Sequence, residues 1–204
     1  MDDRLNLLAL VFAGAAIIAA GCAGGSGNTV GADGPEIDGS KDGSEYYVAT
    51  TGDDGAGDGS QDNPWATIRN ALDTAPEGST IVVSGGTYTI DDYYRFEPSS
   101  GNTVIKAAPG ETAVWASESQ YYIALSPTNG ATVKVQDIEI TAEFGVNGNV
   151  GQGVLSNLTF TETSCRVSSA VVEDSTFNQG SASRGIIVGS NSTVKNCDFS
   201  GAGW

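Results

Sequence analysis

The sequence predicts an all-β solenoid, a parallel β-helix with a short N-terminal capping helix. Three observations predict it. A six-residue motif recurs at intervals of 20, 17 and 22 residues, its third position is always Asp or Asn, and 28 of the 204 residues are glycine. Coils of a solenoid recur at a steady period, so that like residues stack on like. Glycine at this level, about twice the usual ~7%, indicates many tight turns.

The chain begins with a predicted export signal. An apolar run from Leu5 to Ala20 ends at Gly21 and Cys22. Small residues directly before a cysteine resemble the lipobox of bacterial and some archaeal lipoproteins. The resemblance implies a signal peptide over residues 1–21, a diacylglyceryl group on Cys22, and a membrane-anchored lipoprotein at the cell surface or in the periplasm. The alternative is an ordinary signal peptide or an uncleaved signal anchor with an incidental cysteine.

Residues 22–44 are rich in Gly, Ser and Asp and are predicted to form a flexible tether. They carry almost no large apolar side chain, so they bury too little surface to offset the entropy lost on ordering. The β-helix domain is expected to cover residues 45–204. Its last repeat ends at Phe199, too close to residue 204 for a terminal cap, so we expect an incomplete β-helix or an end covered by another chain.

The first elements of the domain are expected in the order strand, acidic loop, short helix, strand. The strands cover residues 46–50 and 79–83. Between them, apolar residues fall on one face of a helix that Thr67 caps and that ends before Pro76 and Gly78: Ile68, Ala71, Leu72 and Ala75. The order from Tyr46 to Tyr88 is similar to the N-terminal entry of right-handed parallel β-helix proteins of the pectate-lyase superfamily. The resemblance implies right-handed coils.

Four copies of the six-residue motif begin at Val135, Leu155, Val172 and Val194. Their first, fourth and sixth positions are apolar or small and are predicted to point inward, whereas the second and fifth are polar. Asn and Asp tolerate left-handed backbone angles and suit a sharp corner between two strands. The third positions are therefore predicted to form a corner ladder: Asp137, Asn157, Asp174 and Asn196. A β-sandwich or jelly roll is the alternative, but two-residue hairpin signals are scarce.

Composition excludes several classes of function. The 25 acidic and 9 basic residues give a net charge of −16, which argues against a nucleic-acid partner or an anionic membrane surface. The absence of histidine excludes a Ser/His/Asp triad and a His-ligated zinc site. Cys165 and Cys197 are too few for a disulfide framework and are expected to be buried small hydrophobic residues, with a disulfide between them as the alternative.

The resemblance also implies a class of chemistry. Polysaccharide lyases of this superfamily carry out β-elimination at a uronate, using a Lys or Arg base and calcium held by Asp and Glu. The weak catalytic candidates are Glu143, Glu162, Arg166 and Arg184. Glu162 and Arg184 fall at equivalent places on adjacent coils, where a solvated ion pair is the alternative. The sequence carries no complete lyase motif.

Two further groups of residues are candidates for ligand binding. Four carboxylates in the first loop are weak candidates to hold calcium, against the alternative of a solvated turn: Asp53, Asp54, Asp58 and Asp62. Four tyrosines, predicted to be exposed, are candidates to stack on sugar rings, against the alternative of half-buried strand residues: Tyr93, Tyr94, Tyr121 and Tyr122. The sequence thus predicts a glycan-directed surface protein that binds or cleaves acidic polysaccharide, with a non-catalytic adhesin or a structural spacer as alternatives.

Overall fold

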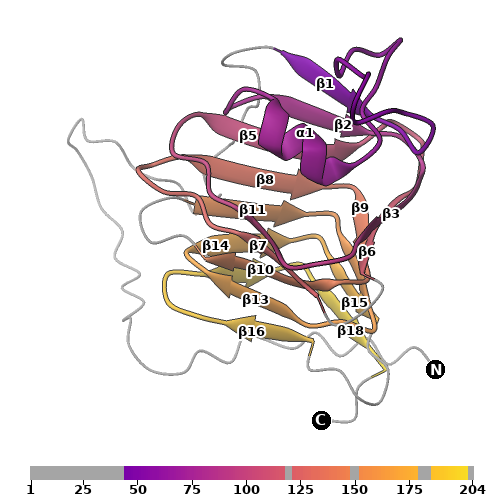
Figure 1. Ribbon diagram of the computed structural model, residues 1–204. Coiled ribbons are helices and arrows are strands. Elements are labelled where there is room, and N and C mark those ends of the chain that lie inside the picture. The colour runs from indigo at the N-terminus through magenta and orange to yellow at the C-terminus, as the bar shows by residue number, and fades with distance from the viewer. Residues whose placement is uncertain (1–43, 118–120, 148–151, 179–184, 202–204) are drawn as a thin grey trace. The chain divides into compact units, whose positions relative to one another are not determined.

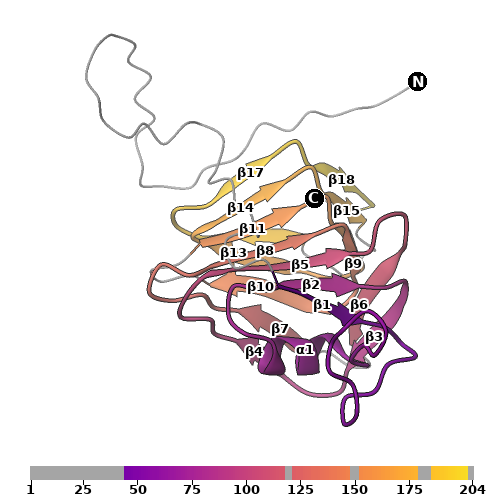
Figure 2. The ribbon, with the colours of Figure 1, turned by 90° about the horizontal axis from the view of Figure 1, so that it is seen from above.

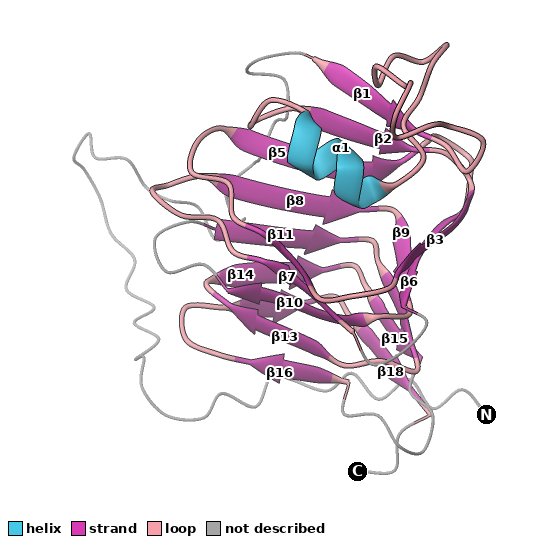
Figure 3. Ribbon diagram, in the orientation of Figure 1, coloured by secondary structure: helices cyan, strands magenta, loops and turns pink. Residues whose placement is uncertain are grey.

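The computed structural model describes residues 44–117, 121–147, 152–178 and 185–201. Strands dominate this part of the chain, and one short helix accompanies them (Figure 3). In chain order the elements are β1 (Glu45–Val48), α1 (Ile68–Thr74), β2 (Thr80–Val83), β3 (Gly86–Ile90), β4 (Tyr94–Phe96), β5 (Asn102–Ala107), β6 (Ala113–Ser117), β7 (Tyr122–Leu125), β8 (Thr132–Gln136), β9 (Ile138–Ile140), β10 (Glu143–Asn147), β11 (Gln152–Ser156), β12 (Thr159–Thr161), β13 (Cys165–Ser168), β14 (Ala170–Glu173), β15 (Thr176–Asn178), β16 (Ile186–Val188), β17 (Thr193–Lys195) and β18 (Asp198–Ser200).

The strands form three sheets, and every pairing between them is parallel. The seven-stranded sheet has the order β1-β2-β5-β8-β11-β14-β17, which can be followed in Figure 2. The five-stranded sheet has the order β16-β13-β10-β7-β4, and the six-stranded sheet the order β18-β15-β12-β9-β6-β3. From β2 to β16 each coil contributes one strand to each sheet, β1 and β17 add a strand at either edge of the seven-stranded sheet, and successive coils stack from β1 toward β18 (Figure 1). The predicted parallel β-helix is therefore confirmed.

The interior is filled by ladders of like side chains. In the six-stranded sheet, Phe160 pairs with Phe177 and Phe177 with Phe199, and their ring centroids lie 4.7 and 4.9 Å apart. Phe160 and Phe177 are completely buried. Each such ring pair stabilises the fold by roughly 0.5–1.5 kcal/mol beyond the burial of its area. Stacking along the solenoid thus holds one coil to the next.

The corners between the seven-stranded and six-stranded sheets have left-handed backbone angles. The φ values are 61° at Asp137, 51° at Asn157, 51° at Asp174 and 52° at Asn196. The Asn157 side-chain amide donates a hydrogen bond of 2.7 Å to the Asp137 carboxylate on the preceding coil. A left-handed angle costs most residues roughly 1–2 kcal/mol, and Asn and Asp reduce that cost through local hydrogen bonds. This explains why these two residue types occupy the corner.

The first loop and α1 cover the N-terminal edge of the seven-stranded sheet. The Tyr47 N–H donates to the Gly59 carbonyl at 2.8 Å, and the Trp65 N–H donates to the Tyr47 carbonyl at 3.0 Å, so the outer edge of β1 has hydrogen-bond partners. Ile68, Ala71 and Leu72 of the helix are buried, and Thr67 caps it. An unpaired strand edge invites pairing with another chain, which this arrangement prevents at β1.

Both cysteines of the described part have free thiols. Cys165 is completely buried between Phe144 and Ile186 in an inward ladder, and Cys197 is partly buried. Burial raises the pKa of both thiols. The structure therefore agrees with small hydrophobic residues rather than a disulfide.

Among the described residues, no helix is long and apolar enough to cross a membrane.

Candidate functional site

The outer face of the five-stranded sheet carries two arginines in one row. Strand register aligns Arg95, Ala124, Gly145, Arg166 and Ile187 across β4, β7, β10, β13 and β16. Side chains alternate between the two faces of a strand, and the neighbours of these residues point inward. Adjacent strands lie ~4.8 Å apart, so three steps place the Cα atoms of the two arginines about 14 Å apart. Within this row, the two small residues Ala124 and Gly145 lie between them.

The next outward row brings Glu143 beside Tyr122, because β10 pairs with β7 in that register. Glu143 and Arg166 are both exposed and lie on this face, one strand apart. Two of the four catalytic candidates therefore share a surface. Glu162 instead lies at an exposed corner after β12, where its φ is 53° and its N–H donates to the Asn178 carbonyl at 2.9 Å. Arg184 lies outside the described residues.

Tyr122 lies across strand β10 because residue 145 has no side chain. The Tyr122 hydroxyl occupies the space that a Cβ at Gly145 would need, and that position is 3.1 Å from the Arg166 carbonyl oxygen. The φ of Gly145 is not left-handed, so glycine is required here for space and not for backbone conformation. Gly145 thus allows the phenol to reach the strand that carries Arg166.

The charges of this face act on Tyr122. Burial is the main cause that raises the pKa of its phenol, and Glu143 raises it further, whereas Arg166 and Arg95 lower it. The net direction is upward, so the phenol keeps its proton at neutral pH. A neutral phenol can donate one hydrogen bond and accept another.

The two arginines differ in their surroundings. Arg95 Nε lies 3.0 Å from Glu97 Oε1 and donates to the Ser126 hydroxyl at 3.3 Å. Arg166 is exposed, and in the part of the chain that the structure describes no carboxylate lies within 4.0 Å of its guanidinium. An arginine stays charged in proteins and presents a planar fork of N–H donors. Arg166 is therefore available to an external anion.

Aromatic side chains extend this face near β4 and β7. Tyr93 is 70% exposed and meets Tyr121 edge to face, with ring centroids 5.7 Å apart. Tyr122 is half-buried. The prediction that Tyr94 is exposed is wrong: it is 4% exposed, because strand alternation turns it inward, and its hydroxyl donates to Asp73 at 3.0 Å. Tyr93 and Tyr122 lie beside the arginine row, whereas Tyr121 packs partly against the core. We name this outer surface of β4, β7, β10 and β13 the arginine–tyrosine face.

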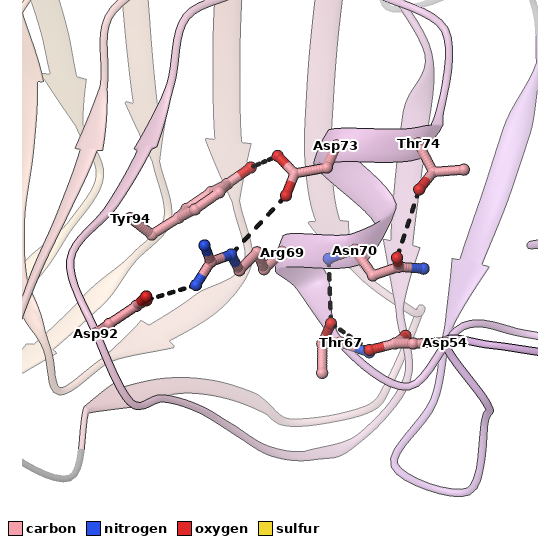
Figure 4. Close-up of polar contacts among 8 residues, drawn as sticks. All are labelled: Asp54, Thr67, Arg69, Asn70, Asp73, Thr74, Asp92 and Tyr94. Atoms are coloured by element: carbon pink, nitrogen blue, oxygen red, sulfur yellow. Dashed lines mark hydrogen bonds and ion pairs between the residues drawn. The ribbon is translucent and has the colours of Figure 1, made fainter.

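The acidic loop uses its carboxylates to hold turns. Asp54 lies beside Thr67 (Figure 4) and accepts hydrogen bonds from the Thr67 N–H at 3.0 Å and the Thr67 hydroxyl at 2.7 Å. It also accepts one from the Ala66 N–H at 2.7 Å. Asp53 accepts from two backbone N–H groups, which lower the pKa of its carboxyl. Asp58 accepts from Ser60. Asp62 lies in the same loop and is exposed.

Among the described residues, no group of three or more Asp, Glu or Cys side chains is placed to hold a metal ion. Calcium binding by the loop stays a prediction.

A second polar cluster fixes α1 to the first coil. Arg69 pairs with Asp92 at 2.5 Å and with Asp73 at 3.8 Å, and it lies 5.3 Å over the Tyr94 ring (Figure 4). Next to it is a cavity of ≈ 230 Å³ between the start of the helix and β3. Because the carboxylates already pair with Arg69, this cluster stabilises the cap, and its cation is less available than that of Arg166.

No protein-family model matches the chain, and no curated protein matches it. Among solved structures, a rhamnogalacturonan lyase is similar, with a TM-score of 0.48 and 13% sequence identity over 77% of this chain and 51% of that one. The chain thus spans about half the length of that lyase. A similarity at this level carries no argument about activity or substrate.

Sequence reasoning missed Arg95 and Gly145. A signal for Gly145 was present, because Ala124, Gly145, Arg166 and Ile187 are each 21 residues apart. The corner motif recurs at unequal intervals of 20, 17 and 22 residues, so it does not indicate this regular row. Arg95 precedes Ala124 by 29 residues, so no constant spacing identifies it.

Proposed function

We propose that this chain is an exported, lipid-anchored β-helix protein that binds acidic polysaccharide on the arginine–tyrosine face. The observation that carries the proposal is Arg166, an exposed guanidinium without a carboxylate partner among the described residues, beside Tyr122 and in one row with Arg95. A guanidinium binds a carboxylate through two parallel hydrogen bonds. Two such groups about 14 Å apart suit a polymer with repeated carboxylates.

The other residues of the face suit sugar rings. The Tyr122 phenol lies over Gly145, between the strands of the two arginines, where its hydroxyl can hydrogen-bond a sugar hydroxyl. Tyr93 is exposed and offers apolar ring surface at one end. Aromatic rings with a polar tip combine contact area with hydrogen bonding.

The net charge of −16 makes this binding depend on salt. At low ionic strength the acidic remainder of the chain repels a polyanion over long distances, and at ~0.1 M salt charges more than about 10 Å apart are largely screened. The contact between Arg166 and a carboxylate is shorter than that distance. We expect affinity to rise from very low salt to an optimum and then to fall as salt weakens the contact itself.

A second candidate function is β-elimination, favoured by the protonated Tyr122 phenol beside Arg166. In this reaction a base removes the C5 proton of a uronate, the C4–O bond breaks, a C4–C5 double bond forms, and the leaving oxygen takes a proton. Tyr122 can supply that proton. An exposed arginine stays charged and is therefore a better ligand for the carboxylate than a base, so we place binding first.

The test measures binding and cleavage on the same samples of mature chain. Pectate, alginate and chondroitin are titrated by calorimetry, and the ultraviolet absorbance of unsaturated uronate is followed with and without calcium. Removing a hydrogen bond to a charged group costs about 1.5–3 kcal/mol, so Arg166→Ala is expected to weaken binding roughly 10- to 150-fold. Lys134→Ala, on the seven-stranded sheet, is the matched control.

The outcomes separate the candidates. Binding that is lost in Arg166→Ala and kept in Lys134→Ala supports the proposed face. Unsaturated product would establish the lyase, and retention without product an adhesin. Absence of binding to all three polymers would argue against both the lyase and the adhesin and would leave a structural spacer.

A further inference from the structure

Two segments of the chain match the acceptor motif for N-glycosylation, Asn-X-Ser/Thr. They are Asn157-Leu158-Thr159 and Asn191-Ser192-Thr193. The motif is relevant only in an exported protein, because oligosaccharyl transfer occurs outside the cytoplasm. The two segments lie in different parts of the coil, and their surroundings differ.

Asn157 is occupied by the corner ladder. Its side-chain amide donates to Asp137 Oδ1 at 2.7 Å, and its backbone N–H donates to the Glu173 carbonyl on the following coil. Asn157 is itself exposed, but coils follow one another at ~4.8 Å and its amide lies against the Asp137 carboxylate of the preceding coil. To react, this amide would have to leave a carboxylate partner and a stacked position, which opposes its entry into a transferase.

Asn191 lies in an exposed turn between β16 and β17. Its neighbour Ser190 is also exposed, its φ is 54°, and among the described residues its side-chain amide makes no hydrogen bond. Thr193, which supplies the hydroxyl of the motif, is exposed as well. Both parts of the motif are therefore accessible, as exposed surface turns generally are to modifying enzymes.

We infer that Asn191 is an N-glycosylation acceptor and that Asn157 is not. The inference rests on the export proposed above, and it needs a lipid-phosphate-linked oligosaccharide as donor. The Asn191 amide nitrogen forms a bond to the anomeric carbon of the donor sugar. The bond from that carbon to the lipid phosphate breaks, the phosphate leaves with the electron pair, and the amide nitrogen gives one proton to the transferase.

Trypsin separates the two motifs, which makes the test direct. Cleavage after Lys134, Arg166, Arg184 and Lys195 places Asn157 in residues 135–166 and Asn191 in residues 185–195. The full chain is purified from the membrane or surface fraction of the cells that produce it, and both peptides are analysed by mass spectrometry. We expect a glycan on the 185–195 peptide and an unmodified 135–166 peptide.

Variants give the controls. Asn191→Gln and Thr193→Ala should abolish the modification, Thr193→Ser should keep it, and Thr159→Ala, which removes the other motif and leaves the ladder residue in place, should change nothing. A surface-exposed chain with an unmodified 185–195 peptide, or a glycan on Asn157, would overturn the inference. A chain found only in the cytoplasm would overturn it together with the proposed export. Polysaccharide binding is measured separately on unmodified recombinant chain, so its failure is a distinct result.

Discussion

Residue Asn157 allows a sharp test of the corner geometry. In the middle of a strand or helix, Ala usually gives a more stable protein than Gly, by roughly 0.5–1 kcal/mol. At a φ of 51° the order should reverse, because a Cβ is disfavoured in the left-handed region and glycine is not. We therefore compare Asn157→Ala with Asn157→Gly.

The magnitude follows from two contributions. Both variants lose the hydrogen bond to Asp137, worth about 0.5–1.5 kcal/mol. Asn157→Ala also bears a left-handed cost of roughly 1–2 kcal/mol. Asn157→Gly instead bears about 0.5–1 kcal/mol of backbone entropy. We expect a loss of about 1.5–3.5 kcal/mol for Ala and about 1–2.5 kcal/mol for Gly.

Urea denaturation followed by tryptophan fluorescence measures both free energies of unfolding. Thr159, two residues later in the extended strand β12, gives the matched control, since Thr159→Ala should be more stable than Thr159→Gly. If Asn157→Ala equals or exceeds Asn157→Gly in stability, the left-handed angle does not decide which residue occupies the corner.

Three further predictions follow from the structure. Gly145→Ala should displace the Tyr122 hydroxyl and weaken polyuronate binding, measured by calorimetry, as much as Tyr122→Ala does. The free energy of unfolding should change by less than about 1 kcal/mol, because the backbone angle at residue 145 is an ordinary one. Phe160→Ala should lower the free energy of unfolding by about 3–5 kcal/mol, because it removes a fully buried ring from the aromatic stack. The free energy of unfolding should fall in alkaline solution, because burial raises the pKa of Cys165 and Tyr94 above their ordinary values of 9.0 and 10.0. The contribution of these two groups to stability is full below those ordinary values and is lost as the pH rises above them. Urea midpoints measured between pH 8 and 11 will show this loss.

Each of these has a control. Ala124→Ser, in the same outward row as Gly145, tests whether any larger side chain in this row weakens binding. Thr161→Ala, on the outer face beside Phe160, should cost less than about 1.5 kcal/mol. Cys165→Ala should reduce the loss of stability that begins near pH 9. If the stability of the parent chain does not change between pH 8 and 11, Cys165 and Tyr94 do not have the pKa values raised by burial on which this prediction depends.

The sequence by itself determined the fold class, because each coil of a solenoid corresponds to one short sequence repeat. The corner residue, the inward apolar positions and the cap sequence before Ile68 are each short-range signals. Stacking of like on like then follows from parallel pairing, as the Phe160 and Phe177 rings show. No longer-range information was needed for these elements.

The tertiary structure decided which residues share a surface. Arg95 and Arg166 are 71 positions apart in sequence, and loops of unequal length separate their coils, so only strand register reveals that they lie in one row. Strand alternation turned Tyr94 inward and left Tyr93 exposed. The space above Gly145 is likewise defined by a side chain from another coil. A functional face depends on contacts between coils, and contacts of that kind are fixed by pairing in space, which a local pattern does not encode.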